Sequence, residues 1–284
     1  PASGFMKISK HPISKAQLKN GGDLDLLLLG CGSAFATTLH QTNVLVVKGN
    51  DHLLIDCGTQ CTLALAQVGL KLSAIQTFLI THSHADHIGG LEEAQLNARY
   101  ITKKRPNMVI TQQYQDILWN QSLRGGSEQS EVKLLTFPDL WKVIRPKPIK
   151  GFSRDCWQTS IGSIDVKMFR TMHFPDKAKS WRDSAWSCGL IIDERILFTS
   201  DTRFDPQMLA EFDSKFSLEV IFHDCQLFTG GVHTSITELS HLPESIRRKI
   251  VLVHYGDNWR DFMAQANDAK FHSWGRQGHT YQFD

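Results

Sequence analysis

The sequence predicts a layered α/β protein, and three observations lead to this class. Short apolar runs, each about as long as one buried strand, recur along the chain. Five of these runs end at or beside an acidic residue or a histidine, and segments with helical spacing follow two of them. The chain has 284 residues, of which 41% are hydrophobic, and this composition is ample for a buried core.

In the first part of the chain, the apolar runs predict strands at residues 24–29, 42–48, 52–55 and 77–80, and helical spacing predicts helices at 61–70 and 91–100. The glycine-rich segment 30–34 is predicted to be the turn that ends the first strand. It is not read as a nucleotide-binding loop, because it lacks a third glycine and no amphipathic helix follows it. Residues 107–160 are the least informative, and they indicate a strand at 108–111, a helix at 114–124 and an extended linker at 145–148.

The second part of the chain predicts strands at 164–169, 186–193, 195–198, 219–222 and 250–253. Over the whole chain, five strands end at or beside an acidic residue or a histidine: Asp56, His82, Asp201, His223 and His254. In layered α/β proteins, ligands bind at the carboxyl ends of strands. We therefore expect these side chains to converge on one rim of the molecule.

Composition gives no indication of a nucleic-acid or membrane partner. The net charge is only +2, and no apolar run approaches the ~18 residues of a membrane span. Residues 1–5 ahead of Met6 are interpreted as an expression remnant, and the lack of a leader predicts a cytoplasmic protein. The six cysteines form no C-x-x-C pair, which indicates reduced thiols.

The most informative segment runs from His82 to His87 and has the pattern H-x-H-x-D-H directly after a predicted strand. Imidazole and carboxylate groups suit zinc, manganese or iron(II), and the turn can point His82 and His84 one way and Asp86 and His87 another. The alternative is a polar turn whose histidines cap a helix and face water. Asp56 also has two readings: it orients a ligand imidazole from behind, or it caps the next helix.

Taken with His173, Asp201 and His254 farther along, this pattern resembles the metallo-β-lactamase superfamily over residues 24–254. The resemblance implies a four-layer αβ/βα sandwich, with two mixed β-sheets flanked by helices, formed by residues 6–284 as a single domain. It also implies two divalent metal ions, with zinc expected and manganese as the alternative. By this resemblance one ion would be held by His82, His84 and His173, the other by Asp86, His87 and His254, and Asp201 would bridge both.

Within the superfamily, the chain is most similar to the ribonuclease Z-type phosphodiesterases. Gly30-Cys31-Gly32-Ser33-Ala34 with Thr42-Asn43 matches their first motif, and Ser200-Asp201-Thr202 resembles their G-D-T. His223-Asp224 stands where that branch has His-Glu, and His233-Thr234-Ser235 where it has His-Ser-Thr. Only 27 residues separate His173 from Asp201, without the Gly/Pro-rich arm of tRNA-processing members, so small phosphodiesters and above all 3′,5′-cyclic nucleotides are the expected substrates.

The expected reaction is hydrolysis of a phosphodiester by a metal-bridging hydroxide. His233 is the candidate general acid and Asp224 keeps it cationic, and Asp86 and His223 complete the candidate catalytic set. His233 as a surface-loop residue and His223 as a packing residue at the sheet end remain open alternatives. Other functions considered are tRNA 3′-processing, a glyoxalase II-like thioester hydrolase and a non-catalytic binding protein. The resemblance also implies a homodimer.

Overall fold

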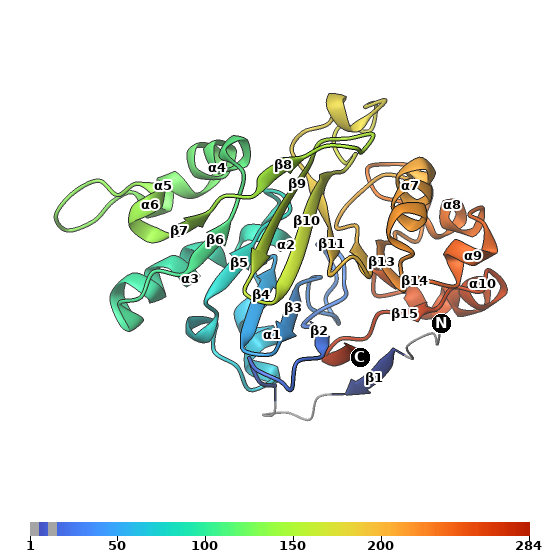
Figure 1. Cartoon of the computed structure of the whole chain (residues 1–284), viewed down its shortest axis with the longest axis horizontal. Helices are drawn as coiled ribbons and strands as arrows, with labels where there is room; N and C mark the ends of the chain where they lie inside the picture. Colours follow the sequence, from blue (N-terminus) through green and yellow to red (C-terminus); the bar gives the residue numbers. More distant parts are fainter. Residues whose placement is uncertain (1–5, 11–15) are drawn as a thin grey trace.

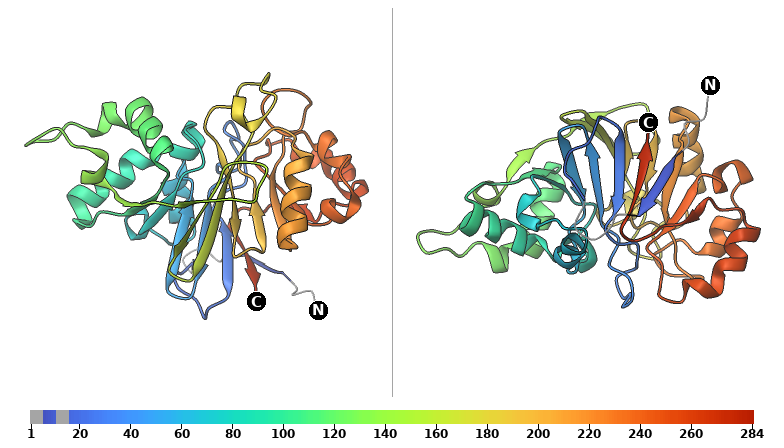
Figure 2. Two further views of the ribbon diagram at one scale, coloured as in Figure 1. Left: turned by 45° about the horizontal axis from the view of Figure 1, so that its top comes forward. Right: turned by 90° about the horizontal axis from the view of Figure 1, so that it is seen from below.

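Two eight-stranded sheets lie face to face, and helices cover their outer faces (Figures 1 and 2). The computed structural model describes residues 6–10 and 16–284, so the predicted expression remnant at residues 1–5 lies outside the described residues. In the right-hand view of Figure 2, the sheets stand between a green and cyan group of helices and an orange and red group. The expected four-layer arrangement of two mixed sheets flanked by helices is confirmed.

The first sheet has the order β1-β16-β2-β3-β4-β5-β6-β7. Its strands are β1 (Lys7–Lys10), β16 (His279–Phe283), β2 (Leu24–Leu28), β3 (Val44–Lys48), β4 (Asp51–Ile55), β5 (Thr77–Leu79), β6 (Asn107–Val109) and β7 (Lys142–Ile144). Pairing is antiparallel from β1 to β4 and parallel from β4 to β7. The helices of this half are α1 (Cys61–Gln67), α2 (Ala85–Ile88), α3 (Leu91–Asn97), α4 (Gln112–Leu118), α5 (Arg124–Ser127) and α6 (Phe137–Leu140).

The second sheet has the order β15-β14-β13-β12-β11-β10-β9-β8. Its strands are β8 (Lys147–Ile149), β9 (Cys156–Ile161), β10 (Ile164–Arg170), β11 (Cys188–Ile192), β12 (Ile196–Phe198), β13 (Val220–Asp224), β14 (Ile250–Val253) and β15 (Ser273–Trp274). Pairing is antiparallel from β8 to β12 and parallel from β12 to β15. The helices of this half are α7 (Pro206–Phe216), α8 (Ile236–Ser240), α9 (Glu244–Arg247) and α10 (Met263–Asp268).

The first sheet is buried on both faces, and strand β2 shows why its sequence is almost entirely apolar. Leu24, Leu26 and Leu28 belong to the core between the two sheets. Leu27 and Leu29 belong to a second core on the outer face of the sheet, under the helices. Because successive side chains of a strand point to opposite faces, a strand buried on both sides needs apolar residues at nearly every position.

One sequence expectation for residues 107–160 was wrong, whereas the expected strand and helix correspond to β6 and α4. The expected linker at 145–148 is not a free connection, because Lys147–Ile149 forms strand β8. The short segment between Ile144 and Lys147 takes the chain from the first sheet to the edge of the second. Pro146 explains the break, since a proline has no N–H to continue a strand ladder. In the described part of the chain, no helix is long and apolar enough to cross a membrane.

Candidate metal centre

The carboxyl ends of strands from both sheets meet at one site. Strands β4 and β5 are parallel neighbours in the first sheet, and they lead into Asp56 and the turn at 80–84. Helix α2 begins at the end of that turn and carries Asp86 and His87. In the second sheet, β12 leads to Asp201 and β14 leads to His254. The fold therefore brings the ends of sequence-distant strands together, as the strand pattern predicted.

Two groups of possible metal ligands share the carboxylate of Asp201, and a third group joins Asp224 and His233 to Asp201 and His254. The ligand atoms within each group lie within 4.8 Å of one another. The first group consists of His82, His84, His173 and Asp201, and the second of Asp86, His87, Asp201 and His254. All seven predicted ligands thus come together, in the two sets that the sequence resemblance implied, with Asp201 common to both.

Short contacts between ligand atoms mark the two positions. His82 Nε2 lies 2.9 Å from His84 Nδ1, and His173 Nε2 lies 3.4 Å from that same nitrogen. In the second group, Asp86 Oδ2 lies 3.2 Å from His254 Nε2. The nitrogen and oxygen donors converge as they would around a cation that binds imidazole and carboxylate.

The ligand groups that share Asp201 are called the cluster below, and their charges support a metal site. Every ion pair that Asp86 and Asp201 make within the described residues is with a histidine, so no Lys or Arg neutralises these buried carboxylates. Burial by itself would lower the pKa of His87 and His254, but neighbouring carboxylates outweigh it and hold both pKa values well above the ordinary range. Protons on imidazole balance the charge here, and divalent cations fit the same donors.

The pKa values of histidines in the first group are shifted in the opposite direction, toward the neutral form. Burial lowers the pKa of His173 to about 4, and burial likewise lowers the pKa of His82 well below its ordinary value. These imidazoles are therefore neutral near pH 7, and the neutral form is the one that binds a metal.

Asp56 lies behind His87 and fixes its orientation. Its Oδ2 lies 2.7 Å from His87 Nδ1, and its Oδ1 accepts a 2.8 Å hydrogen bond from the backbone N–H of Thr81. The helix-capping alternative is excluded, because the residue at the N-cap of α1 is Gln60. With Nδ1 engaged by Asp56, the Nε2 atom of His87 faces Asp201 at 3.2 Å. This is the typical carboxylate–histidine support of a metal ligand.

Asp224 and His233 form a pair at the edge of the cluster. Asp224 is the last residue of β13, and its Oδ2 lies 2.8 Å from His233 Nδ1. The same oxygen accepts a 3.0 Å hydrogen bond from the N–H of Thr202, and Oδ1 lies 3.3 Å from His254 Nδ1. Burial opposes a charge on His233, yet Asp224 raises its pKa above the ordinary value. His233 is thus anchored on the cluster rather than free on a surface loop.

His223 does not reach the cluster. It is fully buried and precedes Asp224 on strand β13, so the two side chains point to opposite faces of the sheet. Its Nδ1 contacts the carbonyl oxygen of Asp224 at 2.7 Å. None of the ligand groups found among the described residues contains His223. This geometry corresponds to the packing alternative for His223.

Several supporting contacts were not predicted from the sequence. The Val232 carbonyl lies 2.8 Å from His173 Nδ1, and the Asn43 side chain donates to the Asp86 carbonyl at 3.2 Å. A Cβ at Gly58 would clash with that same Asp86 carbonyl, so only glycine fits there. The motif Thr42-Asn43 was a signal for the Asn43 contact, but the contact of Val232 is made by backbone and has no residue-type signature.

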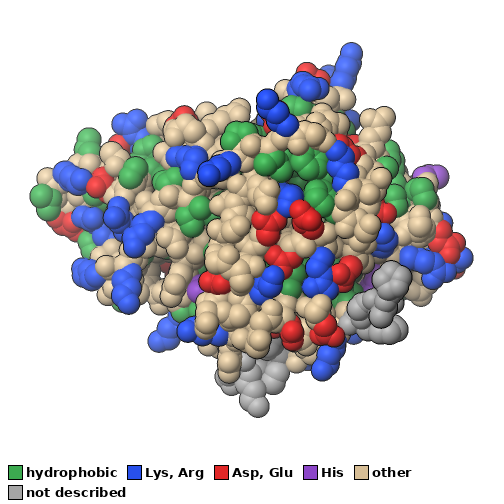
Figure 3. Space-filling model, viewed as in Figure 1, with side chains coloured by type: hydrophobic (Ala, Val, Ile, Leu, Met, Phe, Trp, Pro, Cys, Tyr) green, Lys and Arg blue, Asp and Glu red, His purple; other side chains and the backbone are tan. Residues whose placement is uncertain are grey.

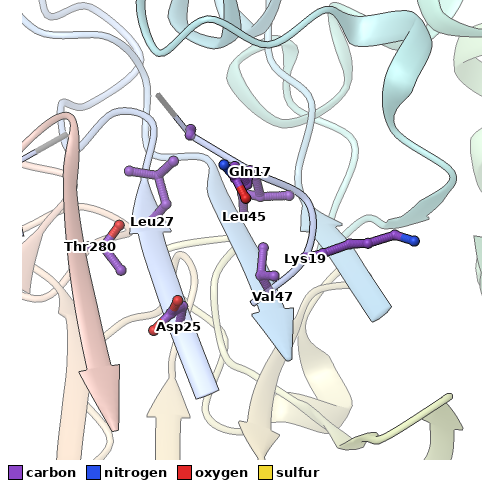
Figure 4. Close-up of a pocket in the computed structure, with 8 residues that line it drawn as sticks. Gln17, Lys19, Asp25, Leu27, Leu45, Val47 and Thr280 are labelled. Carbon is purple, nitrogen blue, oxygen red and sulfur yellow. The ribbon is translucent and has the colours of Figure 1, made fainter. Parts of the chain in front are cut away.

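Two cavities border the cluster. One, of about 220 Å³, is lined by residues including His84, His173 and Trp186. The other, of about 260 Å³, is lined by residues including His233 and His254. A third hollow of about 200 Å³ (Figure 4) has no histidine among its lining residues and lies against strands β2 and β3. The face of the molecule shown in Figure 3 carries both acidic and basic side chains, with several Lys and Arg side chains gathered at its left end.

Comparisons with known proteins agree with this architecture. A family model described as "Anti-Pycsar protein Apyc1" matches residues 24–281. The Anti-Pycsar protein Apyc1 of Bacillus phage vB_BsuM-Goe3 is 34% identical over 261 residues, which are 89% of this chain and 96% of the relative. The protein of that name from Paenibacillus harenae is 35% identical over 236 residues, which are 82% of this chain and 90% of the relative.

Solved structures show the same fold at low sequence identity. The metallo-β-lactamase fold protein YhfI from Bacillus subtilis has a TM-score of 0.67 and 14% identity, over 92% of this chain and 99% of that chain. Yeast PDE1 has a TM-score of 0.57 and 15% identity, over 93% and 100%. The short form of human tRNase Z has a TM-score of 0.54 and 17% identity, over 83% and 94%. The expected metallo-β-lactamase fold is thereby confirmed.

Proposed function

Because the chain belongs to the family of anti-Pycsar protein Apyc1, we propose that it is a metal-dependent phosphodiesterase that opens 3′,5′-cyclic nucleotides. The enzyme class expected from the sequence, a metal-dependent phosphoric diester hydrolase, agrees with the family and with the fold of its neighbours. The observation that carries the proposal is the placement of the Asp224–His233 pair beside two ligand groups that share Asp201. This combination supports hydrolysis of a phosphodiester whose leaving group needs a proton.

The two ligand groups would each hold one divalent ion. When bound, such ions activate water near neutral pH and neutralise the oxygens of a phosphodiester. The chain contributes the geometry. Asp56 holds His87 in one orientation and the carbonyl of Val232 holds His173, so the ligands are arranged before substrate arrives.

His233 would give the leaving oxygen its proton. Its Nδ1 is engaged by Asp224, and no partner for its Nε2 is found among the described residues. Nε2 is therefore the atom free to donate to the substrate. Asp224 stabilises the cationic imidazole, and the same carboxylate is held by the N–H of Thr202. After transfer, the alkoxide of the opened ring leaves as a neutral hydroxyl.

The dimensions of the site favour a small substrate. The two cavities that border the cluster are about 220 and 260 Å³, a size that fits parts of one nucleotide. The 27 residues between His173 and Asp201 contain a short 3₁₀ turn (Trp181–Asp183) and strands β11 and β12. Strands β11 and β12 belong to the second sheet, and only residues 174–187 precede them outside it, a short segment for an arm that would grip tRNA.

The test is turnover of an equimolar panel of 3′,5′-cyclic nucleotides and a precursor tRNA, with and without a chelator. We expect chelator-sensitive loss of cyclic nucleotides and intact tRNA. Cleavage of tRNA alone would refute the proposal. Turnover of neither substrate would also refute it and would favour the alternative of a thioester hydrolase. In the same assay His84→Ala should bind less metal and lose turnover, because it lacks a donor that lies between His82 and His173. Zinc as the metal, a homodimer and a cytoplasmic location stay predictions.

A further inference from the structure

We infer that the cavity beside His233 and His254 receives the nucleobase of the substrate, which stacks on Phe35 and Phe228, and that Asp257 positions the Phe35 wall. This inference rests on the proposed function, and it names the part of the substrate that each side of the cluster binds. It is carried by the exposure of the two phenylalanines, by the way their loops are fixed, and by the continuity of the cavity with the cluster.

Phe35 and Phe228 are unusually exposed for large apolar side chains. They are 92% and 69% exposed, and both line the cavity of about 260 Å³. No contact of either ring with another aromatic ring is found in the described part of the chain. Two exposed aromatic rings at one cavity beside a catalytic cluster indicate a ligand with an aromatic face of its own.

The cavity on the opposite side of the cluster has one exposed aromatic ring, Phe174, which is 40% exposed and already packs edge-on against His84 and His173. Its two largest aromatic side chains, Tyr114 and Trp186, are buried and stack on each other with centroids 5.5 Å apart and an 8° angle between planes. Arg170 also makes a cation–π contact with Trp186, with its Cζ 4.9 Å from the ring centroid. These rings already have partners in the fold, so the cavity of Phe35 and Phe228 is the better stacking site.

The wall that carries Phe35 is fixed by one carboxylate. Asp257 accepts four hydrogen bonds from Thr37 and Thr38. The backbone N–H groups donate at 2.8 and 3.0 Å, and the hydroxyls at 2.7 and 2.6 Å. The N–H of Ser33 also donates to the carbonyl of Tyr255 at 3.0 Å. The loop is thus held on the segment that follows His254, and Asp257 acts as a positioning residue.

The wall that carries Phe228 is fixed at its base. The N–H of Gln226 donates to the carbonyl of Thr234 at 2.8 Å, and the N–H of Ile236 donates back to the carbonyl of Gln226 at 2.9 Å. Between these points the loop runs through Phe228 to His233. This pair of bonds closes the base of the loop and keeps the segment that carries Phe228 next to the segment that carries His233.

The cavity is continuous with the reaction site, which identifies its occupant. His233 and His254 line the cavity, and both also belong to the third group of possible ligands, with Asp201 and Asp224. A cyclic nucleotide with its phosphate at the cluster can therefore extend its base along the cavity. Stacking accepts every base because each has a π face, whereas the carboxamide of Asn258 in the lining can donate to one base edge and accept from another.

The test compares each nucleotide with a substrate that lacks a base. Phe35→Ala and Phe228→Ala are assayed on 3′,5′-cyclic AMP and UMP and on the abasic 1,2-dideoxyribose 3′,5′-cyclic phosphate. We expect KM for both nucleotides to rise by about tenfold or more in each variant, the range that loss of one stacking contact gives, with kcat little changed. Turnover of the abasic substrate should not change, and Tyr at either position should restore KM.

Asp257→Ala should raise KM for the nucleotides in the same way without changing the abasic substrate, since it releases the loop that carries Phe35. Asp257→Asn keeps one acceptor oxygen and should give an intermediate KM. Val132→Ala is the matched control, because Val132 is also an exposed apolar side chain, at 88%, and does not line the cavity.

The outcomes separate the two proposals. If the wild-type protein turns over no cyclic nucleotide, the proposed function fails and the base site fails with it. If it turns over cyclic nucleotides but Phe35→Ala and Phe228→Ala leave KM unchanged, the base site alone is refuted. An equal loss on the abasic substrate would also refute it, because the rings would then act on the fold or the cluster rather than on the base.

Discussion

Replacing His233 by alanine should slow the reaction only where the leaving oxygen needs a proton. A positioned general acid contributes about 10²- to 10⁴-fold, which corresponds to roughly 3 to 5 kcal/mol of barrier. His233 is held at 2.8 Å by a carboxylate that is itself 1% exposed, so its geometry is well defined. We therefore expect a loss in kcat near the middle of that range, about 10³-fold, on a 3′,5′-cyclic nucleotide.

The assay uses two substrates that differ in their leaving groups. The alkoxide of a cyclic nucleotide is a poor leaving group and needs the acid, whereas the phenolate of bis(p-nitrophenyl) phosphate leaves unaided. His233→Ala should lose about 10³-fold on the first and less than about tenfold on the second. Metal content, measured on the same samples, should not change. An equal loss on both substrates would refute the assignment, and so would loss of the metal.

Three further predictions concern the support of the site. Asp56→Ala should weaken metal binding by about 10- to 100-fold, measured by competition with a chromogenic chelator, because His87 loses the carboxylate at its Nδ1; unchanged affinity would show that Asp56 only stabilises the fold. Gly58→Ala should lower the free energy of unfolding by about 1–3 kcal/mol and reduce metal content, because its Cβ would displace the backbone of Asp86; wild-type melting and metal content would contradict the clash. Asp257→Asn should lower Tm near pH 7. Hydrogen bonds from Thr38 and Thr37 lower the pKa of Asp257, so its stabilisation is present above the ordinary Asp pKa and is lost as pH falls below it; a Tm difference that persists in acid would contradict this.

The sequence predicted the central strands and the convergence of the candidate metal ligands best, because both depend on strong local signals. Continuous apolar runs marked β2, β3 and β14, and the spacing of H-x-H-x-D-H carried a coordination mechanism. Helix α7 was missed although Asp205 and Pro206 form an N-cap and first-turn proline, a recognisable start signal. Strand β9, with the sequence CWQTSI, was missed because it is only partly buried and has no clean alternation.

Of the candidate catalytic residues His223 and Asp224, only Asp224 faces the cluster, and the sequence contained the reason. His223 and Asp224 are adjacent on one strand, and the alternation of a strand allows only one of the two to face the cluster. The exposure of Phe35 and Phe228 could not be predicted, because a phenylalanine beside a turn is as easily buried as exposed. The position of Phe35 depends on Asp257, which holds its loop from more than 200 positions away in the sequence.

The loop between Gln226 and Ser235 supports several parts of the proposed site at once. Its backbone holds His173 through Val232, and its side chains include Phe228 and His233. An insertion or deletion there would disturb a proposed ligand, the proposed proton donor and one wall of the proposed base site in one event. The loop from Ser33 to His40 carries Phe35 and none of the proposed ligands, so its length and composition can vary at lower risk. A substitution within residues 33–40 would therefore alter the proposed base site and leave every proposed ligand in place.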